Sequence, residues 1–329
     1  MKKIAIFSIA AMLLIVSVWG HGAAGGGTDK TADAKSTETV LKHKVENKNA
    51  PVVYYTRDVS ARGLLKVYKA LNQRVTGKVG IKVSFGGDNE QYLDPKLMTE
   101  LAKETKGMFL DACGYTPPRD DPPGTYAAAE RHGLAAVAPV DIIDRDGDVD
   151  MPVRGGYHLK YARTGAHLKN YDTLIAVHRF KAHYLPRFGG NMKNISLCLG
   201  SLSGKAIIHS AGTNENSYER KDDDITSQSF ADAAKAAMDY KRGRWAFINV
   251  MGKFEPSDSC KGTKNLGDIG IIASLDPVAV DQASCDFEFG AAPSEEIRNA
   301  WEKTHSVDLL EYAEKIGVGS RHYQLVSVD

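Results

Sequence analysis

The residues that could do chemistry gather between His178 and His209, in the stretch HRFKAHYLPRFGGNMKNISLCLGSLSGKAIIH. Histidines, lysines, a pair of glycines and two asparagines interrupt an otherwise apolar sequence. Core helices and strands repeat apolar residues at a fixed period, and ordinary loops seldom combine several cations with paired glycines. This pattern indicates a functional site.

Part of this stretch has the features of an anion-binding site. Gly189 and Gly190 precede a predicted helix that begins at Asn191 and contains Lys193 and Asn194. Free N–H groups at a helix start attract negative charge, paired glycines let an anion approach the backbone, and lysine adds a full charge. We therefore predict that these five residues bind an anion such as a carboxylate. The structural alternative is a tight turn beside a solvated lysine.

Further polar residues stand at the ends of predicted strands. Lys82 lies within one strand, Asp111 near the end of the next, and His178 directly after a third. Ligands of parallel sheets bind outside the carboxyl ends of the strands, so we expect these side chains at one edge. We predict His178, Lys181 and His183 as catalytic residues, because histidine transfers protons near neutral pH, and Lys82 as a substrate-binding residue.

A divalent metal site is an alternative interpretation of the same histidines. The candidate ligands are His178, His183 and His209, with Asp111 or Asp276 adding an oxygen. Such a set suits zinc, nickel or iron. The five-residue spacing of the first two histidines puts them on opposite faces of a strand and off register on a helix. Only an irregular loop could bring them to one metal ion.

The elements that position these residues alternate along the chain. Predicted strands cover residues 79–85, 108–112, 140–143, 174–177, 245–250, 269–273 and 323–328. Predicted helices cover 95–106, 125–132, 191–199, 225–240, 277–289, 294–303 and 307–316, with Asp276 as the N-cap before Pro277. This alternation predicts an α/β fold, with a mostly parallel sheet and helices on both faces, in a single large domain that could carry a small subdomain. Residues 144–165 are expected to form a long loop or a small hairpin.

The N-terminal residues predict export. Lys2 and Lys3 precede an apolar run from Ile4 to Val18, and small residues follow, as in a secretory signal peptide. The run is shorter than the roughly 20 residues of a membrane span, and no later segment approaches that length. We expect a signal peptide over residues 1–24, a flexible linker over 25–50 and a folded domain over 51–329. The mature protein is expected in the periplasm or outside the cell, without a membrane span after signal removal; an uncleaved signal anchor is the alternative.

Composition and cysteine spacing limit the partners. The 329 residues carry a formal net charge of +1, so no global field attracts nucleic acid, and we expect a small-molecule ligand instead. Cys113, Cys198, Cys260 and Cys285 form no CxxC pair, which weakens zinc and iron–sulfur interpretations. In an exported protein they allow three fully paired connectivities. Cys198 is expected to be a buried small hydrophobe, with a nucleophilic thiol as the alternative.

Three segments resemble the family known as domain of unknown function 362: VGIKVSFG, the central stretch from His178 to His209, and SLDPVAVDQAS from Ser274 to Ser284. The resemblance runs from about Pro51 to the C-terminus. Many members carry a ferredoxin-like insert with CxxCxxCxxxCP repeats and are described as uncharacterised iron–sulfur proteins. This chain has no cysteine in residues 210–230, so we expect no 4Fe–4S cluster. The resemblance implies the α/β core with its Lys82, His178, Lys181, His183, FGG and Lys193 positions, but no established reaction.

Two functional classes follow from these features. The first is an enzyme on a small anionic or carbonyl-containing substrate, in which Lys181 and Lys193 hold charge and His178 or His183 moves a proton. Neighbouring cations would lower histidine and lysine pKa values toward the catalytic range. The second is a non-catalytic exported protein that binds a metal or a small ligand. The pattern specifies neither a resident cofactor nor an oligomeric state.

Overall fold

The computed structural model describes residues 41–87, 92–182, 188–252, 267–292 and 308–329, with single positions at 295 and 299. The predicted signal peptide, residues 25–40 of the predicted linker, His183 and Cys260 lie outside the described residues, as does most of the predicted helix 294–303. Within the described part of the chain, no helix is long and apolar enough to cross a membrane.

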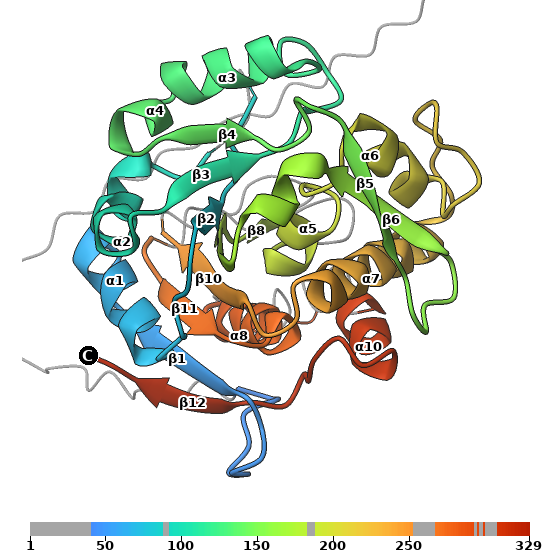
Figure 1. Ribbon diagram of the computed structural model, residues 1–329. Coiled ribbons are helices and arrows are strands. Elements are labelled where there is room, and N and C mark those ends of the chain that lie inside the picture. Colours follow the sequence, from blue (N-terminus) through green and yellow to red (C-terminus); the bar gives the residue numbers. More distant parts are fainter. Residues whose placement is uncertain are drawn as a thin grey trace, which may run out of the picture. The chain divides into compact units, whose positions relative to one another are not determined.

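An eight-stranded sheet lies at the centre of the described domain, in the order β12–β1–β11–β10–β7–β2–β3–β4 (Figure 1). The strands are β1 (Val52–Thr56), β2 (Val79–Lys82), β3 (Met108–Asp111), β4 (Val140–Ile142), β7 (Thr173–Arg179), β10 (Trp245–Met251), β11 (Gly270–Ser274) and β12 (Gln324–Ser327). The five neighbouring strands from β10 to β4 are parallel, whereas β11 is antiparallel to both β1 and β10. The predicted α/β fold with a mostly parallel sheet is confirmed.

Helices cover both faces of this sheet (Figure 1). They are α1 (Ala61–Ala70), α2 (Thr99–Thr105), α3 (Pro122–Arg131), α4 (Leu134–Val137), α5 (Asn191–Ile195), α6 (Leu202–His209), α7 (Asp223–Tyr240), α8 (Pro277–Gly290) and α10 (Asp308–Lys315), with 3₁₀ turns at Pro95–Met98 and Ala166–Asn170. Strand β7 shows why two layers are needed: Leu174 and Ala176 belong to one apolar core, and Ile175 and Val177 to the other. Both faces of the strand are buried because its side chains alternate between them.

Two small hairpins lie outside the main sheet. β5 (Asp148–Pro152) pairs with β6 (Tyr161–Gly165), so the hairpin alternative for residues 144–165 is the correct one. β8 (Lys181–Ala182) pairs with β9 (Phe188–Gly189), which places Lys181 opposite Gly189.

The folded domain begins earlier than the predicted boundary at Pro51. Lys44 forms an isolated parallel bridge with Tyr323, and the Nδ1 atom of His43 lies 2.9 Å from Oδ1 of Asp286. Residues 41–50 therefore pack on the C-terminal part of the chain, where a flexible linker was expected.

The sheet order identifies the edge where a ligand would bind. From β2 the chain continues outward to β3 and β4, and from β7 it continues in the opposite direction to β10. The order therefore reverses between β2 and β7, and ligands of open α/β sheets bind beyond the carboxyl ends of the strands at such a reversal. Lys82 ends β2, and His178 is the penultimate residue of β7.

Candidate functional site

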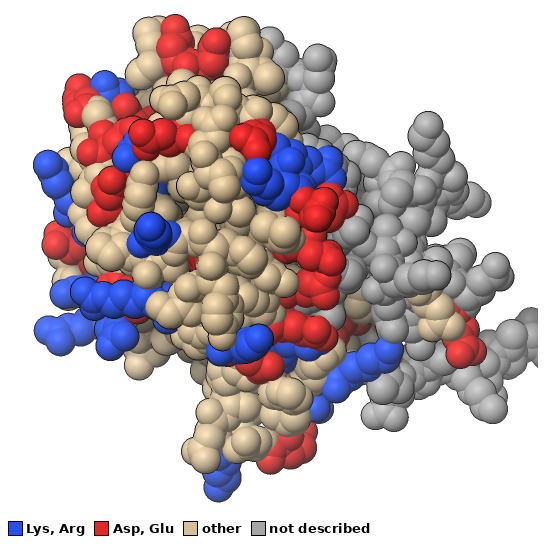
Figure 2. All heavy atoms as spheres, turned by 90° about the vertical axis from the view of Figure 1, so that its right-hand side faces the viewer, with Lys and Arg blue, Asp and Glu red and all other residues tan. Residues whose placement is uncertain are grey.

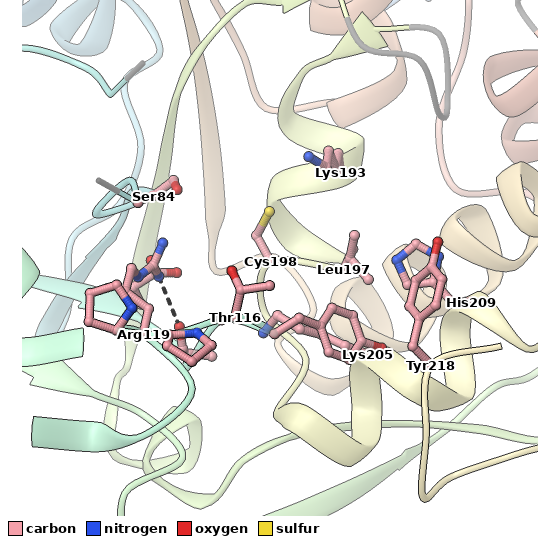
Figure 3. Close-up of a pocket in the computed structure, with 16 residues that line it drawn as sticks. Ser84, Thr116, Arg119, Lys193, Leu197, Cys198, Lys205, His209 and Tyr218 are labelled. Carbon is pink, nitrogen blue, oxygen red and sulfur yellow. Dashed lines mark hydrogen bonds and ion pairs between the residues drawn. The ribbon is translucent and has the colours of Figure 1, made fainter. Parts of the chain in front are cut away.

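A cavity of about 830 Å³ lies beyond the carboxyl ends of β2 and β3, a volume within the range of about 300–1,000 Å³ usual for small-molecule sites. It is lined by Ser84, Gly87, Asp111, Ala112, Gly114, Tyr115, Thr116, Pro117, Pro118, Arg119, Lys193, Leu197, Cys198, Lys205, His209 and Tyr218. In Figure 3, Ser84 and Arg119 lie on one side of this cavity and His209 and Tyr218 on the other, with Cys198 between them.

A buried ion network forms one wall of the cavity. The Nζ of the fully buried Lys82 donates to Oδ1 of Asp111 at 3.0 Å and to Oδ1 of Asn194 at 2.9 Å. The other Asp111 oxygen accepts from Arg119 Nη2 at 2.5 Å and from the Phe85 N–H at 2.9 Å. Burial alone would raise the pKa of Asp111, but the charges of Lys82 and Arg119 lower it below its usual value. Asp111 is therefore ionised, and both of its oxygens are already bonded.

Positive charge exceeds negative charge in the lining of the cavity. Among the described residues that line it, Arg119, Lys193 and Lys205 are cationic and Asp111 supplies the one carboxylate. Lys205 is buried on α6, where its Nζ donates to the Gly200 carbonyl, and burial lowers its pKa. The exterior differs from this lining, since acidic and basic side chains intermix on the face in Figure 2. The face seen in Figure 2 therefore does not share the cationic character of the described cavity lining.

Two buried histidines lie beside these cations. Burial, together with Lys193 and Lys205, lowers the pKa of His209 to about 4, and its Nδ1 has no hydrogen-bond partner among the described residues. His178 lines a smaller cavity of about 110 Å³ together with Lys181 and Lys193. Burial and the neighbouring cations lower the pKa of His178 well below its usual value, and its Nε2 is likewise buried without a described partner. Both imidazoles are thus neutral at pH 7 and able to accept a proton.

The start of α5, where an anion was predicted, already holds a carboxylate of the chain. Asp281 on α8 accepts from the N–H groups of Asn191 at 2.8 Å and Met192 at 2.7 Å, and from Nδ2 of Asn249 at 2.7 Å. Gly190 has a φ of −132°, which any residue can adopt, but a Cβ there would lie 2.5 Å from Oδ1 of Asp281. The glycine is needed for space and not for its backbone freedom.

The remaining residues of the predicted anion site have separate positions. Gly189 lies against His178, since a Cβ there would be 3.3 Å from the Nε2 of that histidine. Asn194 holds Lys82 and also donates from Nδ2 to the carbonyls of Lys82 and Val177. Of the five residues predicted to bind an anion at the helix start, Lys193 is the one that lines the large cavity.

The predicted metal ligands do not converge in the described part of the chain. No group of three His, Cys, Asp or Glu side chains there could hold a metal ion. Asp276 is the N-cap of α8, as predicted, and its oxygens accept from the N–H groups of Val278, Ala279 and Ser320. The ring of His209 packs against Tyr218. His183, another candidate ligand and catalytic residue, lies outside the described residues.

The described cysteines are not paired in disulfides, in contrast to the fully paired connectivities considered for an exported protein. Cys113, Cys198 and Cys285 are free, and the fourth cysteine is outside the described residues. Cys113 and Cys285 are buried, whereas Cys198 is partly exposed in the cavity wall and is not the buried hydrophobe that its apolar neighbours predicted.

Several cavity residues had no clear signal in the sequence. Arg119 and Tyr115 flank two prolines in a loop, and Tyr218 lies in the polar segment after α6, so no periodicity marks them. Lys205 had a usable signal, because it is the one charged residue inside the otherwise apolar LSGKAIIH segment. A charged residue at a buried helical position is uncommon and points to a partner or a ligand.

Comparison with known proteins classifies the chain. Residues 79–286 match the family described as Domain of unknown function (DUF362). The chain belongs to this family. No curated protein matches it.

Two solved structures are similar to the chain over 74% of its length. One is the lactate racemase apoprotein from Thermoanaerobacterium thermosaccharolyticum, with 16% identity and a TM-score of 0.42. The other is a structural-genomics target from Thermotoga maritima, with 10% identity and a TM-score of 0.44. The chain covers 58% and 59% of the lengths of these two proteins.

Proposed function

We propose that this DUF362 protein is an enzyme that binds a small anionic, carbonyl-containing substrate in the 830 Å³ cavity. The observation that carries the proposal is the set of three cationic side chains that line one cavity. Its described lining contains one carboxylate, that of Asp111, which is already paired with Lys82 and Arg119. Cations that converge on one cavity bind an anionic ligand through charge-assisted hydrogen bonds, and partial exclusion of water strengthens that attraction. The signal-like first 24 residues support action outside the cytoplasm.

Arg119 is the best positioned of the three cations. Its Nη2 is fixed by Asp111 and by the Ala112 carbonyl, while its buried Nε has no hydrogen-bond partner among the described residues. A guanidinium held in this way loses little further conformational entropy when it binds a carboxylate or phosphate. Lys193 and Lys205 add charge from α5 and α6.

His209 is our candidate for proton transfer in the large cavity, in addition to His178 in the smaller one. A histidine with a pKa of about 4 is a weak base at neutral pH. Because Lys193 and Lys205 contribute to that lowering, a bound anion would offset their charges and raise the pKa toward the range useful near pH 7. The same cations would stabilise negative charge that develops on a substrate oxygen.

Calorimetric titration with oxalate and with inorganic phosphate tests the proposed site. We expect saturable binding, and we expect Lys193→Ala and Lys205→Ala each to weaken it by about tenfold, equivalent to about 1.4 kcal/mol. Lys103→Ala is the matched control, because Lys103 is an exposed lysine on α2 that does not line the cavity.

Equal affinity in the wild type and both cavity variants would contradict the proposed site, as would the absence of binding. Binding that depends on both lysines, without turnover of any anionic carbonyl compound, would favour the alternative of a non-catalytic binding protein.

A further inference from the structure

The side of the cavity away from Arg119 is aromatic. Tyr115, His209 and Tyr218 line it, with ring centroids 4.7 Å apart for His209 and Tyr218 and 5.5 Å apart for the two tyrosines. Phe230 packs edge-on behind His209 at 5.6 Å, which fixes the imidazole from outside the cavity. Such rings present both faces and edges to a planar group.

Polar atoms in this aromatic wall lack partners. His209 is 5% exposed, and its Nδ1 has no hydrogen-bond partner among the described residues; the same holds for the buried hydroxyl of Tyr115. Buried polar atoms are nearly always hydrogen-bonded, so two such atoms at one cavity wall point to a ligand with polar groups on or beside its ring.

The cavity is also larger than a small anion that would bind its three cations. A bound water occupies only about 30 Å³, and oxalate or phosphate is a few times larger, so neither would fill a space of about 830 Å³. Figure 3 places Arg119 and the His209–Tyr218 pair on opposite sides of this space. A ligand that reaches both sides would carry charge at one end and a ring at the other.

We infer that the ligand of this cavity is an aromatic or heteroaromatic carboxylate or phosphate, whose anionic group binds Arg119, Lys193 and Lys205 and whose ring packs against Tyr115, His209 and Tyr218. This inference rests on the proposed function, since it assigns the substrate class of the same site. Tyr218 is 49% exposed, so a substitution at this position changes the aromatic wall without creating a cavity in the hydrophobic core.

Matched pairs of ligands test the inference by calorimetry on the full chain. Benzoate is compared with cyclohexanecarboxylate, and phenyl phosphate with cyclohexyl phosphate, because each pair keeps the charge and nearly the size while removing the π-system. We expect the aromatic member of each pair to bind about tenfold more tightly, the upper range for aromatic packing. We expect Tyr218→Leu to reduce this preference at least threefold, and Tyr218→Phe to keep it.

The outcomes separate the two levels of the proposal. If oxalate and inorganic phosphate bind through Lys193 and Lys205 but the aromatic and cyclohexyl ligands bind equally, the aromatic assignment is wrong and the anion site stands. If none of the six anions binds, both proposals fail. A preference for aromatic ligands that survives Tyr218→Leu and Tyr115→Leu would also overturn the assignment of the ring subsite to this wall.

Discussion

The start of α5 and the adjoining cavity both bury polar groups, but they satisfy them in different ways. At the helix start, the carboxylate of Asp281 accepts from two backbone N–H groups and from Asn249, all within 2.8 Å. Oδ1 of Asn191 is buried there without a described partner, whereas the cavity wall has three such atoms: Arg119 Nε, His209 Nδ1 and the Tyr115 hydroxyl. Internally satisfied polar groups fix a structure, whereas unsatisfied ones indicate where a ligand completes it. Because the carboxylate at the helix start is bonded within the chain, we propose that the first region is scaffold and that the second is the site.

The largest expected effect is the loss of stability when the Asp281 carboxylate is removed. We expect Asp281→Ala to lower the free energy of unfolding by about 3–5 kcal/mol, because three donors lose a buried charged acceptor. Urea denaturation measures this change. Molecules of the variant that remain folded should bind oxalate as the wild type does. A stability loss below 1 kcal/mol, or a selective loss of anion binding, would show that Asp281 belongs to the site.

A smaller effect is expected at Gly190. A Cβ at this position would lie 2.5 Å from the Asp281 carboxylate, so Gly190→Ala should destabilise the fold by about 1–3 kcal/mol through overpacking. Combining it with Asp281→Ala should remove most of that loss, because the side chain that clashes is gone. Additive losses in the double variant would contradict the close packing of these two residues.

The two regions should also respond to pH with opposite signs. Burial raises the pKa of Asp281 to about 6, so its contribution to stability is present below about pH 4 and is lost as the pH rises through 6. The pKa of His209 is lowered to about 4 from 6.5, so its contribution is present above pH 6.5 and is lost as the pH falls toward 4. In the wild type, the free energy of unfolding at each pH contains both of these opposed contributions.

Single variants separate the two pH trends. Between pH 6.5 and 4, His209→Gln should reduce the acid-induced loss of stability by at most about 1.4 kcal/mol per pH unit, whereas Asp281→Asn should make that loss steeper. Urea midpoints measured across this interval provide the test. Parallel curves for the wild type and His209→Gln would show that this imidazole titrates as it does in the unfolded chain.

Most of the fold could be predicted from local sequence. Strands such as β7 and β10 are short, mostly apolar runs, and Asp276 before Pro277 marks the start of α8. The reversed direction of β11 could not be predicted, because strand direction depends on long-range pairing and not on the strand's own residues. β1, α1 and α6 were not predicted; in α6 the buried lysine interrupts the apolar pattern that would have marked a helix.

The site was predictable only where local rules apply. Lys82, Asp111 and His178 follow from the rule that ligands bind at strand ends, and the structure places all three at that edge. The Asp281 cap could not be predicted, because it comes from a helix some ninety residues after the glycines that it contacts. Arg119 and Tyr218 enter the cavity from loops, where sequence spacing does not determine position in space.

Alkylation of Cys198 tests the central claim, that the cavity attracts small anions, most directly. Cys198 lines the cavity with Lys193 and Lys205, while Cys113 and Cys285 are buried. Its rates with anionic iodoacetate and with neutral iodoacetamide would be followed by mass spectrometry of the Cys198 peptide. We predict an iodoacetate-to-iodoacetamide rate ratio about tenfold higher in the native protein than in urea, and a fall toward the unfolded ratio in Lys193→Gln and Lys205→Gln. The same ratio in native and unfolded protein would contradict the account.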